Sequence, residues 1–192
     1  MISQLRLAIV ILTLMTLITG VLYPLVVTGL AQLLFPNQAN GSLMVTENDK
    51  TKGSNLIGQA FSSPRHFWGR PSATGPFPYN AAASSGSKLG PTNPALADAV
   101  KARIAALKVA DPENPLAIPV DLVTASASGL DPHISPAAAE YQIRRVAKAR
   151  NISIEKLREL VQAHIEERQW GVFGEPRVNV LTLNLALDTL KD

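Results

Sequence analysis

The chain has 192 residues, of which 46% are hydrophobic and 17% are charged, and its formal net charge is +3. This mild charge excludes the concentrated basic surface that a nucleic-acid-binding protein needs. The absence of cysteine excludes disulfides, thiolate metal sites and cysteine nucleophiles. The three histidines, His66, His133 and His164, lack the spacing of metal ligands, so we expect no metal site.

An uncharged stretch lies between Arg6 and Glu47, and its first part, residues 7–34, is largely apolar. Roughly 20 apolar residues in a helix suffice to cross the hydrocarbon core of a bilayer. The sequence therefore predicts one transmembrane helix over residues 7–34. Residues 1–6 carry an amino terminus and one arginine, which favours a cytoplasmic location and places residues 35–192 outside the cytoplasm.

A cleaved signal peptide is the alternative to a permanent anchor. Gly29, Leu30 and Ala31 have the small-residue spacing of a cleavage site, although the apolar run exceeds a signal peptide's 7–15 residues. Within the anchor, Thr13, Thr16 and Thr19, followed by Gly20, have a spacing that favours a face packed against a partner helix. The simpler interpretation is that these hydroxyls bond to their own backbone. Pro24 is expected to kink the helix.

The extracytoplasmic part is predicted to begin with a polar exit, residues 37–52, that includes a short strand at Ser42–Val45. Residues 58–94 then contain six prolines and five aromatic residues. Prolines exclude a long helix or a central strand, and disordered linkers are poor in aromatic residues. We therefore expect an ordered loop over residues 58–94 that packs on the domain or on a partner.

Helix signals follow this loop. Asn93-Pro94 and Ser135-Pro136 combine an N-cap residue with proline at the first helical position. They predict helices over residues 94–110 and 136–150; Asn151 ends the second, Ser153 caps another helix, and residues 182–190 close the chain as a short helix. Strands are expected at Val120–Thr124 and Val178–Leu181. The predicted fold class is α+β, a single mixed domain with about three helices and few strands behind one membrane helix.

The densest group of chemically active residues runs from Thr124 to His133. Ser126 or Ser128 with Asp131 and His133 suggests a hydrolase, but triad residues are normally far apart in sequence and no G-x-S-x-G elbow is present. The run Ala125–Gly129 could cradle a phosphate before a helix, although no Walker motif accompanies it. The structural alternative, which we favour over the hydrolase, is a tight turn at Gly129 that leads into the helix.

A basic group, Arg144, Arg145, Lys148 and Arg150, follows on the expected helix 136–150. Such a run is most often a solvated helix face, and that is our prediction. The sequence offers no activated nucleophile, metal centre or cofactor fingerprint, and we expect the chain itself not to be an enzyme.

Several segments together resemble the KdpC family, the small subunits of bacterial Kdp potassium-transporting P-type ATPases. They cover residues 18–43, 53–61, 67–73, 79–94, 122–151 and 178–190. The most specific is TASASGLDPHISP followed by Q-x-x-R-V-A-x-A-R. The resemblance implies a non-catalytic subunit of the bacterial inner membrane. Its partners would be a channel-like subunit that selects K⁺ and a P-type subunit that hydrolyses ATP.

The resemblance also implies a catalytic chaperone that raises the ATP affinity of the hydrolysing subunit. The family glutamine linked to nucleotide corresponds to Gln142, and Ser128, Gly129 and Asp131 are the accompanying candidates for this nucleotide effect. Arg144 departs from the proline expected in the family's version of this helix.

A domain outside the cytoplasm cannot contact cytoplasmic ATP directly. We therefore expect the chain to affect ATP affinity only indirectly, through contact with the partner subunits of the complex. The alternative function is a membrane-anchored extracytoplasmic binding or hydrolytic protein unrelated to transport.

Overall fold

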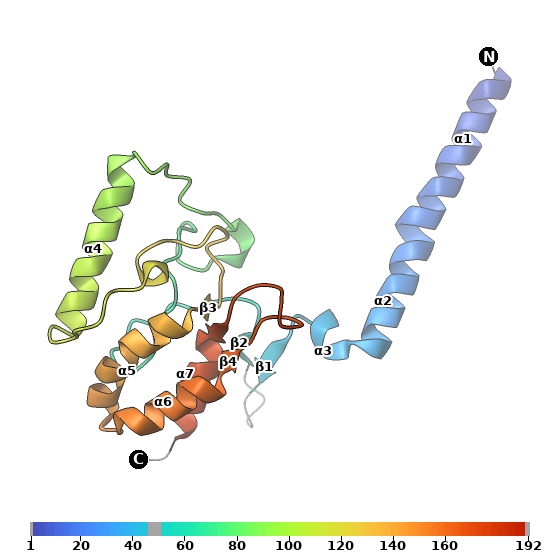
Figure 1. Ribbon diagram of the computed structural model, residues 1–192. Coiled ribbons are helices and arrows are strands. Elements are labelled where there is room, and N and C mark those ends of the chain that lie inside the picture. Colours follow the sequence, from blue (N-terminus) through green and yellow to red (C-terminus); the bar gives the residue numbers. More distant parts are fainter. Residues whose placement is uncertain (1, 46–50, 191–192) are drawn as a thin grey trace. The chain divides into compact units, whose positions relative to one another are not determined.

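The computed structural model describes residues 2–45 and 51–190 and divides the chain into two compact units, residues 1–52 and 53–192. In the first unit (blue in Figure 1) the helical elements are α1 (Ile2–Leu17), the π-helix η1 (Ile18–Leu22), α2 (Tyr23–Leu34) and α3 (Pro36–Ala39). Strand β1 (Leu43–Val45) pairs with β2 (Thr51–Ser54). The predicted strand at Ser42–Val45 is thus confirmed to within one residue.

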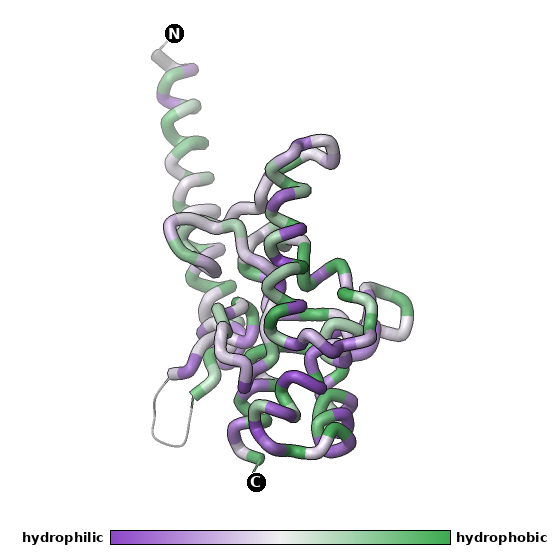
Figure 2. Tube along the Cα trace, turned by 90° about the vertical axis from the view of Figure 1, so that its left-hand side faces the viewer, coloured by the Kyte–Doolittle hydropathy of each residue, from purple (hydrophilic) through white to green (hydrophobic). Residues whose placement is uncertain are grey.

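The residues from Ser3 to Leu34 form one helical rod that is long and apolar enough to cross a membrane. Figure 2 colours much of this rod as hydrophobic. Its large apolar side chains are exposed along the whole length, with Leu12 and Leu25 each 68% exposed. A helix that is apolar on every side needs an apolar environment, which a bilayer supplies. Thr19 donates its hydroxyl to the Met15 carbonyl at 2.7 Å, so this threonine is satisfied within the helix.

The helix changes its geometry just before Pro24. Proline has no backbone N–H and its ring crowds the preceding turn. The Tyr23 N–H donates to the Ile18 carbonyl, five residues back, and Ile18–Leu22 form a π-helical turn. The distortion expected at Pro24 therefore takes the form of a widened turn, one of the established causes of helix kinks.

The second unit contains helices and short strands in mixed order, which confirms the α+β class. After β2 its elements are η2 (Ala81–Ala83), α4 (Pro94–Ala110), η3 (Val120–Leu122), β3 (His133–Ile134), α5 (Pro136–Arg150), α6 (Ile154–Ala163), β4 (Ile165–Glu166), β5 (Arg177–Asn179) and α7 (Val180–Thr189). Among the described residues this unit has four α-helices against the about three of the predicted fold class, and each lies at a segment that the sequence predicts to be helical.

Side-chain caps explain where the helices begin. Asn93 and Ser135 accept hydrogen bonds from the first-turn amides of α4 and α5, and Ser153 does the same for α6. Asn151 ends α5 in the left-handed conformation, with φ of 59°. These boundaries confirm the sequence prediction, because capping depends on neighbours along the chain.

The strand predicted at Val120–Thr124 is wrong, because these residues form η3 and a bend. Both the N–H and the hydroxyl of Thr124 donate to the Val120 carbonyl, at 2.9 and 2.8 Å, and this bonding closes a turn. The strand predicted at Val178–Leu181 stops at Asn179 in the structure. The Asn179 side chain accepts hydrogen bonds from Leu181 and Thr182 and so begins α7.

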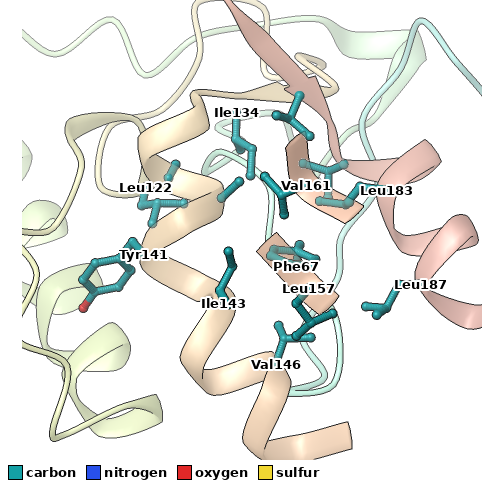
Figure 3. Packing of buried hydrophobic residues seen from close by; sticks show 14 of the residues in the cluster. Phe67, Leu122, Ile134, Tyr141, Ile143, Val146, Leu157, Val161, Leu183 and Leu187 are labelled. Atoms are coloured by element: carbon teal, nitrogen blue, oxygen red, sulfur yellow. The ribbon is translucent and has the colours of Figure 1, made fainter. Parts of the chain in front are cut away.

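The core lies where the three C-terminal helices meet a small sheet. The antiparallel order is β3-β5-β4, with His133 opposite Asn179 and Ile165 opposite Val178. Helices α5 and α7 both pack against β5, and α6 packs against both helices. Figure 3 shows the side chains at the centre, which include Phe67, Ile134, Ile143, Leu157, Leu183 and Leu187.

Candidate functional site

The segment between β2 and α4 is mostly irregular, yet it enters the core. Its only regular element in the described chain is η2. Phe67 in this segment is completely buried, and Trp68 packs against the same cluster. A buried irregular backbone must find hydrogen-bond partners outside any regular ladder. The residues that supply those partners make up the candidate site.

Two buried amide side chains hold the backbone of Phe67 and Trp68. From α7, Asn184 accepts the Phe67 N–H at 2.8 Å and donates to the Phe67 carbonyl at 2.9 Å. From α5, Gln142 accepts the Trp68 N–H at 2.7 Å and donates to the Trp68 carbonyl at 3.1 Å. Each amide is 1% exposed. We call Gln142 and Asn184 the amide clamp, because together they replace the bonds of a neighbouring strand.

All the hydrogen-bonding positions of the Gln142 side chain are used inside the domain. Besides Trp68, its oxygen accepts from the Arg145 guanidinium at 2.7 Å and its nitrogen donates to the Ala138 carbonyl at 3.2 Å. A primary amide has two acceptor and two donor positions. The Gln142 side chain therefore has no hydrogen-bonding position left for a ligand.

Arg145 on α5 contacts the same irregular segment as Gln142. Its guanidinium donates to the Pro64 and His66 carbonyls at 2.7 and 3.0 Å and lies 4.0 Å from the centre of the Trp68 ring. The residue is 5% exposed, and burial lowers the pKa of its guanidinium to about 10. Three hydrogen bonds and an aromatic face replace the water it has lost.

The basic group on α5 is therefore only partly a solvated face, and this prediction needs correction. Lys148 is exposed and Arg144 is half-buried, donating to the Glu113 carbonyl at 2.7 Å. Arg145 is buried, and the Arg150 side chain is 9% exposed. Arg150 donates to the Arg65 carbonyl at 2.7 Å and pairs with Asp188. Two of the four cations thus hold the loop to α5.

The motif before α5 fastens a second part of the loop. The Ser128 carbonyl accepts the Ser85 N–H at 2.9 Å, and the Gly129 carbonyl accepts the Ser72 hydroxyl at 2.7 Å. Gly129 has a φ of +68°, and a Cβ there would lie 2.5 Å from a Thr74 methyl carbon. This position therefore requires glycine both for its conformation and for its space.

Asp131 anchors the end of the motif. Its carboxylate accepts from Arg70 at 3.1 Å and from the His133 N–H at 3.0 Å. Burial acts to raise the pKa of Asp131, but the hydrogen bonds from His133 and the charge and hydrogen bond of Arg70 outweigh it, so that pKa lies below its ordinary value. Tyr79 donates its hydroxyl to the Arg70 carbonyl, and burial raises the pKa of this phenol to about 12.

These contacts support the structural interpretation of the motif over the hydrolase. The Ser126 and Ser128 hydroxyls accept backbone N–H groups, from Gly129 at 2.9 Å and Leu130 at 3.1 Å. The His133 ring faces carboxylates, and over the described ranges neither serine is hydrogen-bonded to it. An open cavity of about 660 Å³ lies beside Asp131 and His133 and is also lined by Arg70 and Ser135.

The structure does not gather the four predicted residues around one point. Gln142 binds Trp68, whereas Asp131 binds Arg70 two residues further along, and Ser128 and Gly129 bind Ser85 and Ser72. What they share is the loop. Sequence reasoning missed Asn184, although a lone asparagine inside the apolar run 180–187 is a signal for a buried polar role.

Fold and site together define a small α+β protein with one N-terminal helix able to cross a membrane and a polar motif that organises its own loop. The family model described as the c chain of K⁺-transporting ATPase, KdpC, matches residues 5–189. The chain belongs to the KdpC family.

Curated relatives match along almost their whole lengths, and each is a potassium-transporting ATPase KdpC subunit. The relative from Dechloromonas aromatica is 63% identical over 98% of both chains. The one from Polaromonas naphthalenivorans is 65% identical over 97% of this chain and 95% of its own. The one from Methylococcus capsulatus is 62% identical over 100% of both.

Proposed function

We propose that this chain is the small, non-catalytic subunit of an ATP-driven potassium uptake complex in a bacterial inner membrane. The match to KdpC over residues 5–189 is the observation that carries the proposal. Within the helical rod Ser3–Leu34, residues 7–34 would cross the membrane and residues 1–6 would lie in the cytoplasm. The domain would then lie outside it and contact a channel-like potassium-selecting subunit and a P-type subunit that hydrolyses ATP.

The proposed effect on ATP is indirect. The amide of Gln142 is 1% exposed and its four hydrogen-bonding positions are occupied. Ser128, Gly129 and Asp131 likewise bind the loop, through the Ser128 and Gly129 carbonyls and the Asp131 carboxylate. The chain would raise the ATP affinity of the hydrolysing subunit by presenting a correctly arranged loop to its partners, and Gln142 would act as a positioning residue for that loop.

Purification of the tagged full-length chain in mild detergent tests the assembly. We expect two large membrane proteins to accompany it in a constant ratio. A matched control replaces residues 7–34 by an unrelated leucine-alanine span, which keeps Arg6 and the membrane anchoring and tests the anchor's own sequence. Recovery of the native chain as a lone monomer would contradict the proposal and favour a free-standing tethered binding or hydrolytic protein.

A fluorescent ATP analogue tests the indirect route. We expect the purified full-length chain to show no saturable binding, while the assembled complex binds the analogue. Saturable binding by the chain alone would show direct contact, and its loss in Ser128→Ala at an unchanged thermal midpoint would locate that contact near the motif.

A further inference from the structure

Three exposed apolar side chains gather at the end of one hairpin of the domain, and one of them is the most exposed large apolar side chain in the described part of the chain. Strands β4 and β5 are joined by residues 167–176, in which Gln169 and Phe173 form an isolated bridge. At the end of this hairpin Trp170 is 89% exposed, Val172 69% and Phe173 59%. We call these three side chains the aromatic tip. Exposed apolar groups that cluster in this way mark interaction sites.

The aromatic tip is built by a defined turn. The Val172 N–H donates to the Gln169 carbonyl at 3.2 Å, and the two central residues, Trp170 and Gly171, have φ of 53° and 74°. Hairpin turns with two positive φ values strongly prefer Asn-Gly, because a bulky residue is strained there. The rings of Trp170 and Phe173 also meet edge to face, with centres 5.9 Å apart. This turn thus exposes Trp170 while holding its backbone at a positive φ, a conformation that is unfavourable for a bulky residue.

No charge lies on the tip itself. Residues 169–174 carry no ionisable side chain, and the flanking Arg168 and Glu175 pair with each other. The tip can therefore leave water without the cost of desolvating an unpaired charge. Tryptophan, with an apolar body and one N–H donor, is enriched where hydrocarbon meets lipid headgroups.

The size of the tip argues against a protein groove as the main occupant. Two aromatic side chains and one valine offer at most roughly 600 Å² of surface. A stable protein interface buries about 800 Å² on each partner. Interfacial insertion has no such threshold, because each buried apolar group adds to the affinity.

A bilayer is also the surface that the proposed anchor keeps close. Residues 35–50, which include α3 and β1, connect the apolar helix to the rest of the domain and could span at most roughly 55 Å even if fully extended. Tethering at that range gives the membrane a high effective concentration around the domain. A weak insertion is therefore enough to hold the domain against it.

We propose that the aromatic tip inserts into the interfacial layer of the bilayer on the domain's side, an inference that rests on the proposed membrane anchoring. The tip would then be a second point of attachment, formed by Trp170, Val172 and Phe173. It would limit the rotation of the domain about its linker and orient the domain toward its membrane partners.

Spin labelling tests this directly, because the chain has no cysteine of its own. Val172→Cys in the full-length chain is labelled with a nitroxide and reconstituted into phosphatidylcholine-phosphatidylglycerol vesicles. We expect its ratio of collision with oxygen to collision with a water-soluble nickel chelate to exceed, by several fold, that of Val109→Cys. Val109 is 80% exposed on α4 and is the matched control.

Each other outcome overturns the inference in a distinguishable way. An equal ratio at residues 172 and 109 means that the tip stays in water. Low collision with both reagents means that a protein surface covers it. A chain that alkaline carbonate washes from the vesicles overturns the anchoring as well, whereas a retained chain with an aqueous tip overturns only the insertion.

Tryptophan fluorescence gives a second measurement without a label. Vesicles of brominated lipid should quench part of the emission of the native chain, and Trp170→Phe should remove that part. Equal fractional quenching in the two chains would contradict insertion, since the remaining tryptophan, Trp68, is held by the amide clamp.

Discussion

At single positions the domain depends on buried amides that take the place of a strand. Gln142 and Asn184 each bind both the N–H and the carbonyl of one loop residue. An amide side chain suits this role because it presents a donor and an acceptor side by side, as the backbone does. Leucine would fill a similar volume at either position but would leave the loop's polar groups unpaired.

The first prediction concerns this clamp. Gln142→Ala leaves the Trp68 N–H and carbonyl unpaired and opens a cavity, so the free energy of unfolding should fall by about 3 kcal/mol. Thermal unfolding in detergent, followed by the fluorescence of Trp68 in a full-length chain that carries Trp170→Phe, measures the change. Lys148→Ala, at an exposed position on the same helix, should leave the midpoint unchanged. Equal midpoints for the two variants would show that the clamp contributes nothing.

The second prediction concerns acid. Because the folded-state pKa of Asp131 is lowered, the unfolded chain binds more protons in acid, and the carboxylate's contribution is complete only above its unfolded pKa. Stability should therefore fall as the pH drops below about 5 and continue to fall through the folded pKa. Asp131→Asn should weaken the domain at pH 7 and flatten this dependence. An unchanged slope between pH 5 and pH 3 in the variant would assign the acid sensitivity to other carboxylates.

At the level of helices and strands, the sequence predicts best those features that depend on residues close together along the chain. The caps at Asn93, Ser135 and Ser153 lie where predicted, because each side chain bonds amides two or three residues away. Residues 120–124 are apolar enough for a strand, yet Asp121 accepts the Ser135 N–H at 2.7 Å and helps fix a turn. The conformation of residues 120–124 thus depends on contacts with distant residues, which a single sequence does not show.

The third prediction tests the end of α5. Asn151 holds a left-handed conformation that glycine adopts freely and alanine adopts with strain. Asn151→Gly should leave the free energy of unfolding nearly unchanged, whereas Asn151→Ala should lower it by about 1 kcal/mol. Thermal midpoints of the two variants give the comparison. A more stable alanine variant would mean that the turn into α6 relaxes to another conformation.

For the candidate site, the sequence indicated the residues but not their arrangement. The motif at 124–135 stood out by composition, and Gln142 was added by family resemblance. Its partner Asn184 lies 42 positions away, and Phe67 and Trp68 lie on a loop without periodicity. Only tertiary packing brings these segments together. The buried state of Arg145 was missed for the same reason, since its partners are loop carbonyls.

For the whole molecule, the apolar helix was predictable because its length and uninterrupted hydropathy are local properties. Its orientation depends on few charges, since Arg6 is the basic residue next to the apolar run and the next charged residues along the chain are Glu47 and Asp49. The clamp adds a practical constraint: a probe placed at the buried Gln142 would disturb the fold it is meant to report. Exposed positions on the domain serve instead.

The fourth prediction therefore uses Val109→Cys and Val120→Cys, at sites 80% and 70% exposed in the cysteine-free chain. If the domain lies outside the cytoplasm, a maleimide that cannot cross the inner membrane should label both cysteines in intact cells whose outer membrane has been made permeable. Ser3→Cys, before the apolar run, should react only after lysis. Two domain positions are needed because a partner subunit that covers one would block it without any change of side. The reverse pattern, with Ser3→Cys labelled first, would place the domain in the cytoplasm, where direct contact with ATP becomes feasible.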